Sequence, residues 1–176
     1  IVHNIDGDGI LVRNSDNATV ANNTIYDIRT VGLYTGSGIQ SIDSVALNIT
    51  GNQISGTQWD GIRLVHSAHA VVNNNMICEV VRTGIYSEVS GNGDISNNGI
   101  SFAGRRGIHL NYSFTNQVHD NDIDMVGMQG ILSFASTGSL IDNNSVDNTG
   151  LSGIHLDHSQ NNIVSGNVIG ANGGAL

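Results

Sequence analysis

The chain has 176 residues, of which 12% are charged, and its formal net charge is −9. This acidity argues against a nucleic-acid-binding protein and leaves no polybasic anchor for an anionic membrane. No apolar run reaches transmembrane length, and Cys78 is the only cysteine, which excludes an internal disulfide. We interpret Cys78 as a small structural side chain rather than a nucleophile.

A 23-residue period organises the chain. Residues 1–8 continue the register backwards from the first copy (9–37), which carries a six-residue insertion, and further copies follow at 38–60, 61–83, 84–106, 107–129, 130–152 and 153–175. Each copy opens on a glycine followed by an isoleucine; the glycines are Gly9, Gly38, Gly61, Gly84, Gly107, Gly130 and Gly153. A fixed period of this length is typical of repeat proteins, in which each copy packs on its neighbours.

Within each copy, short β-branched runs alternate with polar corners. Six positions after the glycine stands a serine: Ser15, Ser44, Ser67, Ser90, Ser113, Ser136 and Ser159. Fourteen positions after it stands an asparagine: Asn23, Asn52, Asn75, Asn98, Asn121, Asn144 and Asn167. Val or Ile columns flank the asparagine, and the pattern predicts three short strands per copy, separated by turns.

We therefore predict an all-β fold, a single-stranded right-handed parallel β-helix (β-solenoid) of 23-residue coils, about seven to eight in number, forming a single domain over residues 1–176. Successive coils should lie ~4.8 Å apart, and the hand follows from the crossover rule for parallel strands. The asparagines should form a ladder of amides and adopt left-handed backbone at a bend. The serines should form a weaker ladder at a second corner.

Two further patterns refine this prediction. The fourth position of the coil alternates large and small residues, which indicates a unit of two coils: Val12, Ser41, Leu64, Ser87, Leu110, Ser133 and Leu156. A leucine-rich repeat is the rival fold, because Val-x-x-Asn-x-Ile fits the end of its pattern. The leucine that this rival needs two residues before the Val/Ile column is replaced in most copies, as by Ala18 and Gly93, so the β-helix is favoured.

Candidate site residues lie on one strip. Residues that flank an inward side chain on a strand point outward, so the third and fifth positions of each coil should form an exposed strip. This register aligns Arg63, Tyr86 and His109 on successive coils, with Glu88 and Asn111 beside them. The other candidates on or next to the strip are His66, Tyr112, His155 and Asp157. A surface without function would vary as freely, so a structural role for the strip is the alternative.

The Gly-Ile-x-Leu-x-x-Ser opening, with Val/Ile, Asn and Ile at the offsets above, resembles the parallel β-helix repeats of the pectin-lyase-like, carbohydrate-binding and sugar-hydrolysis family, found in mannuronan C5-epimerases, polysaccharide lyases and NosD-like proteins. The resemblance implies an extracellular or cell-surface protein that holds a polysaccharide along the strip. For an epimerase it implies His109 as base, Tyr86 as acid and Arg63 as a clamp on the sugar carboxylate. Where the epimerases carry Asp-Pro-His, this chain has other triplets, such as His109-Leu110-Asn111.

We therefore predict a carbohydrate-interacting module that binds a polysaccharide through Glu88, Asn111, Tyr112, His155, Asp157 and His66. A polysaccharide lyase or uronan C5-epimerase is the first alternative, and a non-catalytic structural or adhesin solenoid is the second. No nucleic acid or membrane is expected as a partner. Because neither end carries a polar cap, we expect further coils of a longer solenoid or end-to-end self-association.

No cofactor or metal is assigned, although three local features suggest alternatives. Asp124 and Asp147 occupy one position in adjacent coils, and calcium would relieve their repulsion. A zinc site at His155, Asp157 and His158 is disfavoured, because His109 would lie roughly 10 Å away. The insertion at 26–37 brings Tyr26, Arg29 and Tyr34, which would wall one side of the strip or be neutral.

Overall fold

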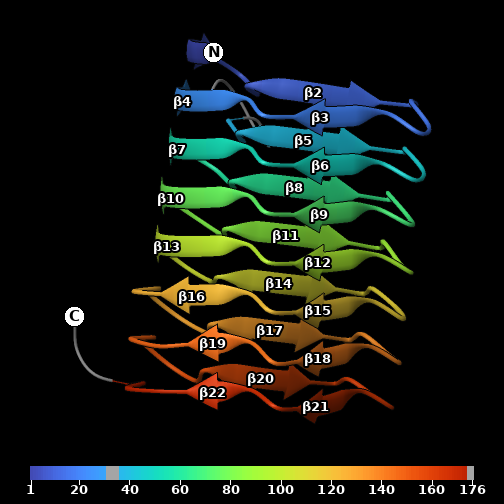
Figure 1. Ribbon diagram of the computed structural model, residues 1–176, viewed down its shortest axis with the longest axis vertical. Helices are drawn as coiled ribbons and strands as arrows, with labels where there is room; N and C mark the ends of the chain where they lie inside the picture. Colours follow the sequence, from blue (N-terminus) through green and yellow to red (C-terminus); the bar gives the residue numbers. More distant parts are fainter. Residues whose placement is uncertain (31–35, 174–176) are drawn as a thin grey trace.

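The computed structural model describes residues 1–30 and 36–173, so Tyr34 lies outside the described residues. It confirms the predicted right-handed parallel β-helix: the coils stack in chain order from the N-terminus at the top of Figure 1 to the last described coil at the bottom, and each passes through three sheets. Among the described residues there is no helix of a length and hydrophobicity that would cross a membrane.

All strand pairs are parallel and join one coil to the next. The first sheet contains β1 (Val2–Asp6), β4 (Thr24–Arg29), β7 (Gln53–Thr57), β10 (Met76–Val80), β13 (Gly99–Ala103), β16 (Asp122–Asp124), β19 (Ser145–Val146) and β22 (Val168–Ile169). The second contains β2 (Ile10–Arg13), β5 (Ile39–Ile42), β8 (Ile62–Val65), β11 (Ile85–Glu88), β14 (Ile108–Asn111), β17 (Ile131–Phe134) and β20 (Ile154–Asp157). The third contains β3 (Thr19–Ala21), β6 (Asn48–Thr50), β9 (Val71–Asn73), β12 (Asp94–Ser96), β15 (Gln117–His119), β18 (Leu140–Asp142) and β21 (Ile163–Ser165).

The core is a set of inward columns, one from each repeated position. The isoleucine that follows each opening glycine is buried in the inner coils, as at Ile62, Ile85 and Ile108. At the fourth position, leucines and serines alternate inside as predicted, and the serines face the serine corner: the Oγ atoms of Ser41 and Ser67 lie 2.9 Å apart. A hydroxyl partner within the core offsets the cost of burying these serines.

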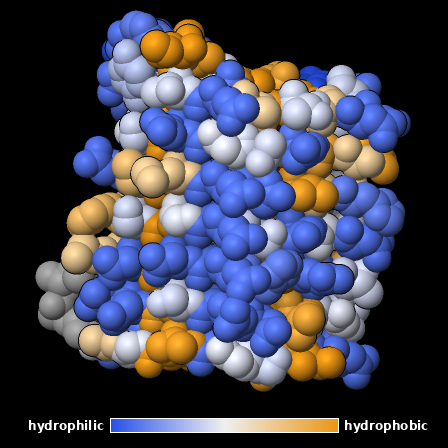
Figure 2. All heavy atoms as spheres, in the orientation of Figure 1, coloured by the Kyte–Doolittle hydropathy of each residue, from blue (hydrophilic) through white to orange (hydrophobic). Residues whose placement is uncertain are grey.

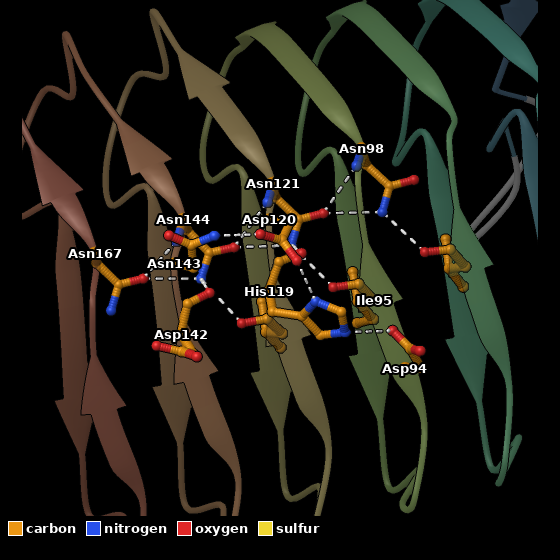
Figure 3. Close-up of polar contacts among 12 residues, drawn as sticks. Asp94, Ile95, Asn98, His119, Asp120, Asn121, Asp142, Asn143, Asn144 and Asn167 are labelled. Carbon is orange, nitrogen blue, oxygen red and sulfur yellow. Dashed lines mark hydrogen bonds and ion pairs between the residues drawn. The ribbon is translucent and has the colours of Figure 1, made fainter.

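The asparagine ladder is present, as Figure 3 shows for Asn98, Asn121, Asn144 and Asn167 on successive coils. Asn98 Oδ1 accepts from the backbone N and the Nδ2 of Asn75, both at 3.0 Å, and Asn98 Nδ2 donates to Asn121 Oδ1 and to a backbone carbonyl. Each inner ladder residue therefore satisfies buried polar groups on both sides of its coil.

The prediction that these asparagines have a left-handed backbone was wrong. Positive φ falls on the residue before the ladder position, as in Asn74 (φ 53°) and Asn97 (φ 53°), and not on the ladder residues themselves. The left-handed residue makes the bend, while the next side chain has to point inward to reach the coils on either side. The serine corner behaves as predicted: the hydroxyl of Ser90 accepts from the backbone N of Ser67 at 2.8 Å.

Inward columns become exposed in the last coil, where Val164 is 43% and Ile169 is 47% accessible. Figure 2 accordingly shows a largely hydrophilic face with hydrophobic atoms at the surface near the top and bottom of the view. The expectation of further coils or of self-association at the ends stays a prediction.

Candidate functional site

The second sheet brings the predicted site residues onto adjacent strands. In the parallel register, the third positions follow one another across β5, β8, β11, β14, β17 and β20 as Gln40, Arg63, Tyr86, His109, Leu132 and His155. Arg63, Tyr86 and His109 are thus direct neighbours, and Glu88 is the register partner of Asn111. The alignment expected from the repeat is the one observed.

The strip is less exposed than predicted. Gln40 and Leu132 are only 5% accessible, and the side chain of Arg63 is 11% accessible. Side chains of the turns that precede the strands lie against the strip, as Asp60 does beside Arg63, and this covers part of it. The charged members of the strip are therefore partly shielded from water, which strengthens their electrostatic interactions.

Arg63 is held by two carboxylates. Its Nη2 lies 3.0 Å from Glu88 Oε2 and its Nη1 lies 3.4 Å from Oδ2 of the buried Asp60. Its guanidinium carbon lies 4.7 Å from the centre of the Tyr86 ring, within range of a cation–π contact. Burial raises the pKa of Asp60, while Arg82 and Arg63 act in the opposite direction. The positive charge of Arg63 is thus already balanced within the protein.

Tyr86 and His109 form an uncharged pair. Their ring centres are 5.1 Å apart in an edge-on arrangement, and Asn111 Nδ2 donates to the Tyr86 hydroxyl at 2.9 Å. Burial, and then the charge of Glu88, raises the pKa of Tyr86. Burial, and then the charges of the nearby Arg106 and Arg82, lower the pKa of His109 to about 3. At neutral pH the phenol therefore keeps its proton and the imidazole is free to accept one.

The cations near this pair were not predicted from the sequence. Arg82 lies in the turn before β11, and Arg105 and Arg106 lie in the turn before β14. The Arg82 guanidinium carbon is 4.0 Å from the centre of the Trp59 ring, and Arg106 Nε donates to Gln129 Oε1 at 3.0 Å. Together with Arg63, these are four of the six basic residues of the chain, all of which are arginines.

We call Arg82, Arg105 and Arg106 the arginine cluster. Within residues 1–30 and 36–173, no carboxylate forms an ion pair with any of the three. Burial lowers the pKa of Arg106, and the charges of Arg105 and Arg82 add to that effect. Arg82 Nε and His109 Nε2 are buried, and neither atom has a hydrogen-bond partner among the described residues. The signal in the sequence was an arginine one or two positions before the coil glycine.

The remaining predicted residues lie elsewhere on or beside the strip. His155 is exposed, and Leu132 separates it from His109 in the register. His66 contacts Asp43 at 3.2 Å, and Asp157 contacts His158 at 2.6 Å. A further candidate, Tyr112, packs edge-on against Phe134 with ring centres 5.8 Å apart. These residues extend the strip in both directions from the central cluster.

The structure adds little support for two alternatives raised by the sequence, a calcium site at Asp124 and Asp147 and a wall beside the strip. Asp124 Oδ1 accepts from Asn148 Nδ2 at 2.8 Å, and the described part of the chain holds no group of three or more His, Cys, Asp or Glu side chains arranged for a metal. Tyr26 and Arg29 lie on β4 of the first sheet, where Arg29 pairs with Asp6 at 3.0 Å, so these two do not form the wall expected beside the strip.

Cys78 lies on β10 of the first sheet and is partly buried. Burial raises the pKa of its thiol, and the charge of Glu79 adds to the rise. A thiol held in its protonated form is a poor nucleophile, which agrees with a structural role.

Comparison with known proteins confirms the resemblance inferred from the repeat. The family described as right handed beta helix region matches residues 1–137 and 60–176, which together span the chain. No curated protein matches this chain. Among solved structures, a mutant of the periplasmic alginate epimerase AlgG superposes with a TM-score of 0.84 at 17% identity, covering 92% of this chain and 42% of AlgG.

Two other solved structures share the architecture. The enzymatically active domain of tailspike protein 2 from bacteriophage CBA120 gives a TM-score of 0.63 at 14% identity, with 95% of this chain and 34% of the tailspike chain covered. The A-module of the Azotobacter vinelandii mannuronan C-5 epimerase AlgE6 gives 0.55 at 13% identity, with 96% and 63% covered. At these identities the likeness shows the fold alone, and the chain spans less than half of the AlgG structure.

Proposed function

The chain belongs to the right-handed β-helix family, and from that premise we propose that it binds an acidic polysaccharide along the strip, with sugar carboxylates facing the arginine cluster. Arg82 and Arg106 take the role of carboxylate clamp that the sequence suggested for Arg63, because Arg63 is already paired with Asp60 and Glu88. Arg63 instead packs its guanidinium over the ring of Tyr86.

The observation that carries this proposal is the charge distribution. In a chain with a net charge of −9, Arg82 and Arg106 lie close enough to His109 to lower its pKa, and among the described residues no carboxylate forms an ion pair with Arg82, Arg105 or Arg106. Like charges gathered in a partly buried place repel one another, and a bound anion would relieve that repulsion. Guanidinium groups are also suited to paired hydrogen bonds with a carboxylate.

The fold offers an extended surface for such a ligand, since the strip runs across consecutive parallel strands. Solved structures that share it are named as alginate and mannuronan epimerases and as a phage tailspike, and these names support an acidic polysaccharide as the ligand and a location outside the cytoplasm, in the periplasm or at the surface.

Removing Arg106 tests the proposal. We expect Arg106→Ala to weaken binding of a polyuronate roughly tenfold or more, because a charge-assisted hydrogen bond is lost from a partly shielded place. Its dependence on salt concentration should also become shallower. Isothermal titration calorimetry with polymannuronate at several salt concentrations measures both effects. Arg29→Ala is the matched control, since Arg29 is exposed on the first sheet, and it should bind as the unaltered protein does.

Equal binding of a neutral polysaccharide, or full affinity in Arg106→Ala, would contradict the proposed ligand class. Loss of binding in Arg29→Ala as well would indicate a diffuse charge effect and not a site.

Catalysis on the same polymer is the second candidate function, and the Tyr86–His109 pair favours it. Removing the proton next to a uronate carboxylate requires a neutral base, a proton donor and a cation that stabilises the developing charge. His109 is unprotonated with a buried, unpaired Nε2, Tyr86 retains its proton, and Arg82 and Arg106 lie near His109. With a pKa of about 3, His109 is a weak base until a bound carboxylate offsets the charges of the two arginines. This set supports an epimerase or a lyase, and its test is the appearance of inverted or unsaturated sugars.

A further inference from the structure

The strip changes character immediately beyond the Tyr86–His109 pair. On β17 the third position is Leu132, which is nearly inaccessible, and the fifth is the partly exposed Phe134. The Phe134 ring lies between two others: its centre is 5.8 Å from that of Tyr112 and 5.8 Å from that of His158, both in edge-on arrangements. We call Tyr112, Phe134 and His158 the aromatic row. It crosses three successive coils.

The rings of the aromatic row are available to a ligand. Tyr112 is 57% accessible and the His158 side chain is 78% accessible, whereas large apolar side chains of the inner coils are mostly buried. None of the three contributes to the buried core. The rings of this row pack on one another and present an apolar surface with polar edges to the solvent.

The aromatic row lies next to the Tyr86–His109 pair. Phe134 is the register partner of Asn111, and Asn111 donates to the hydroxyl of Tyr86. The arginine cluster precedes β11 and β14, whereas the aromatic row lies at the ends of β14, β17 and β20. A polymer that contacts both therefore crosses the second sheet obliquely, past Tyr86 and His109. At the far end, Asp157 lies beside His158 and offers a carboxylate to sugar hydroxyls.

We propose that the aromatic row is a second binding subsite, which stacks pyranose rings of the same polysaccharide whose carboxylates bind the arginine cluster; this inference rests on the proposed function. A pyranose ring has an apolar C–H face that fits an aromatic surface, and a hydroxyl edge that suits the amide of Asn111 and the carboxylate of Asp157.

The two parts of the strip should then respond to different features of one ligand. The arginine cluster should recognise charge and bind even a short uronic-acid oligomer. The aromatic row should add affinity only once the oligomer is long enough to reach across β14, β17 and β20. Dependence of affinity on chain length therefore separates the subsite from the clamp.

The test compares a trimer and a hexamer of mannuronic acid by calorimetry. Phe134→Ala should weaken hexamer binding about tenfold, which corresponds to about 1.4 kcal/mol, because a stacking contact between an aromatic ring and a sugar is lost. Trimer binding should change less than about twofold under the same substitution. Arg106→Ala should weaken both oligomers. Phe102→Ala is the matched control, because Phe102 is a 56% exposed phenylalanine on β13 of the first sheet.

A second variant keeps the test independent of any change at β17. Tyr112 has a left-handed backbone (φ 49°), and the first coil carries Asn14 (φ 48°) at the same position, so Tyr112→Asn keeps the local backbone while removing a ring. It should also weaken the hexamer selectively. Full hexamer affinity in both variants would overturn the inference while leaving the clamp standing. Failure of the unaltered protein to bind either oligomer would overturn the proposed function, and this inference with it.

Discussion

Replacing Gly84 with alanine is expected to destabilise the protein by at least about 3 kcal/mol, because the coil has no room for a side chain at its opening position. A Cβ atom built on Gly84 would lie 2.5 Å from Cγ2 of Ile100 and 2.7 Å from the backbone oxygen of Gly107. The same two kinds of contact recur at Gly38, Gly61 and Gly107, so the repeating glycine reflects packing inside every coil. Chemical denaturation followed by circular dichroism measures the effect.

Gly99→Ala is the matched control for this substitution. Gly99 opens β13, a Cβ there would meet no atom within 4 Å, and its backbone is not left-handed. Its replacement should be neutral or stabilise by up to about 1 kcal/mol, since alanine reduces the freedom of the unfolded chain. If Gly84→Ala unfolded at the same denaturant concentration as Gly99→Ala, the coil packing described above would be wrong.

Asn98→Ala is expected to lower stability by about 3–5 kcal/mol, because it removes the partner of two buried backbone groups on the preceding coil and of the Asn121 side chain on the next. Asn98 Nδ2 donates to the carbonyl of Val72 at 2.9 Å, and Asn98 Oδ1 accepts from the backbone N of Asn75 at 3.0 Å. Thermal and chemical denaturation measure the loss.

The end of the ladder provides the comparison. Asn23 begins the ladder, is only partly buried, and its Nδ2 donates to Ala21 O and Asn52 Oδ1. Asn23→Ala should cost only about 1 kcal/mol, because the groups it leaves behind remain near water. Equal losses in the two variants would show that stability does not depend on burial within the ladder.

The fold could be predicted because every copy repeats the same constraints. The glycine, serine and asparagine columns each solve a packing or hydrogen-bonding problem that recurs once per coil, so their period sets the register of all three sheets. That register placed Arg63, Tyr86 and His109 side by side. The left-handed positions were harder to assign, since Asn74 and Asn75 are the same residue type and only the direction of the side chain distinguishes their roles.

The candidate site was only partly predictable for a related reason. Periodicity shows which side of a strand a residue faces, but it does not show which turn side chains lie against the strand. Asp60 and Glu88 neutralise Arg63, and Arg82 and Arg106 come from turns, where the repeat imposes little on side-chain type. The partial burial of the strip has the same origin, because the turns that cover it lie outside the strand pattern.

The central claim is that an acidic polysaccharide binds beside His109, and nuclear magnetic resonance of the imidazole during a titration with polymannuronate tests it most directly. Because burial and two arginines hold the pKa of His109 at about 3, its signals should be those of a neutral ring before the ligand is added. Binding should shift them, while a neutral polysaccharide should leave them unchanged, and new inverted or unsaturated sugar signals would add catalysis. Unchanged His109 signals at saturating polymannuronate would contradict the account.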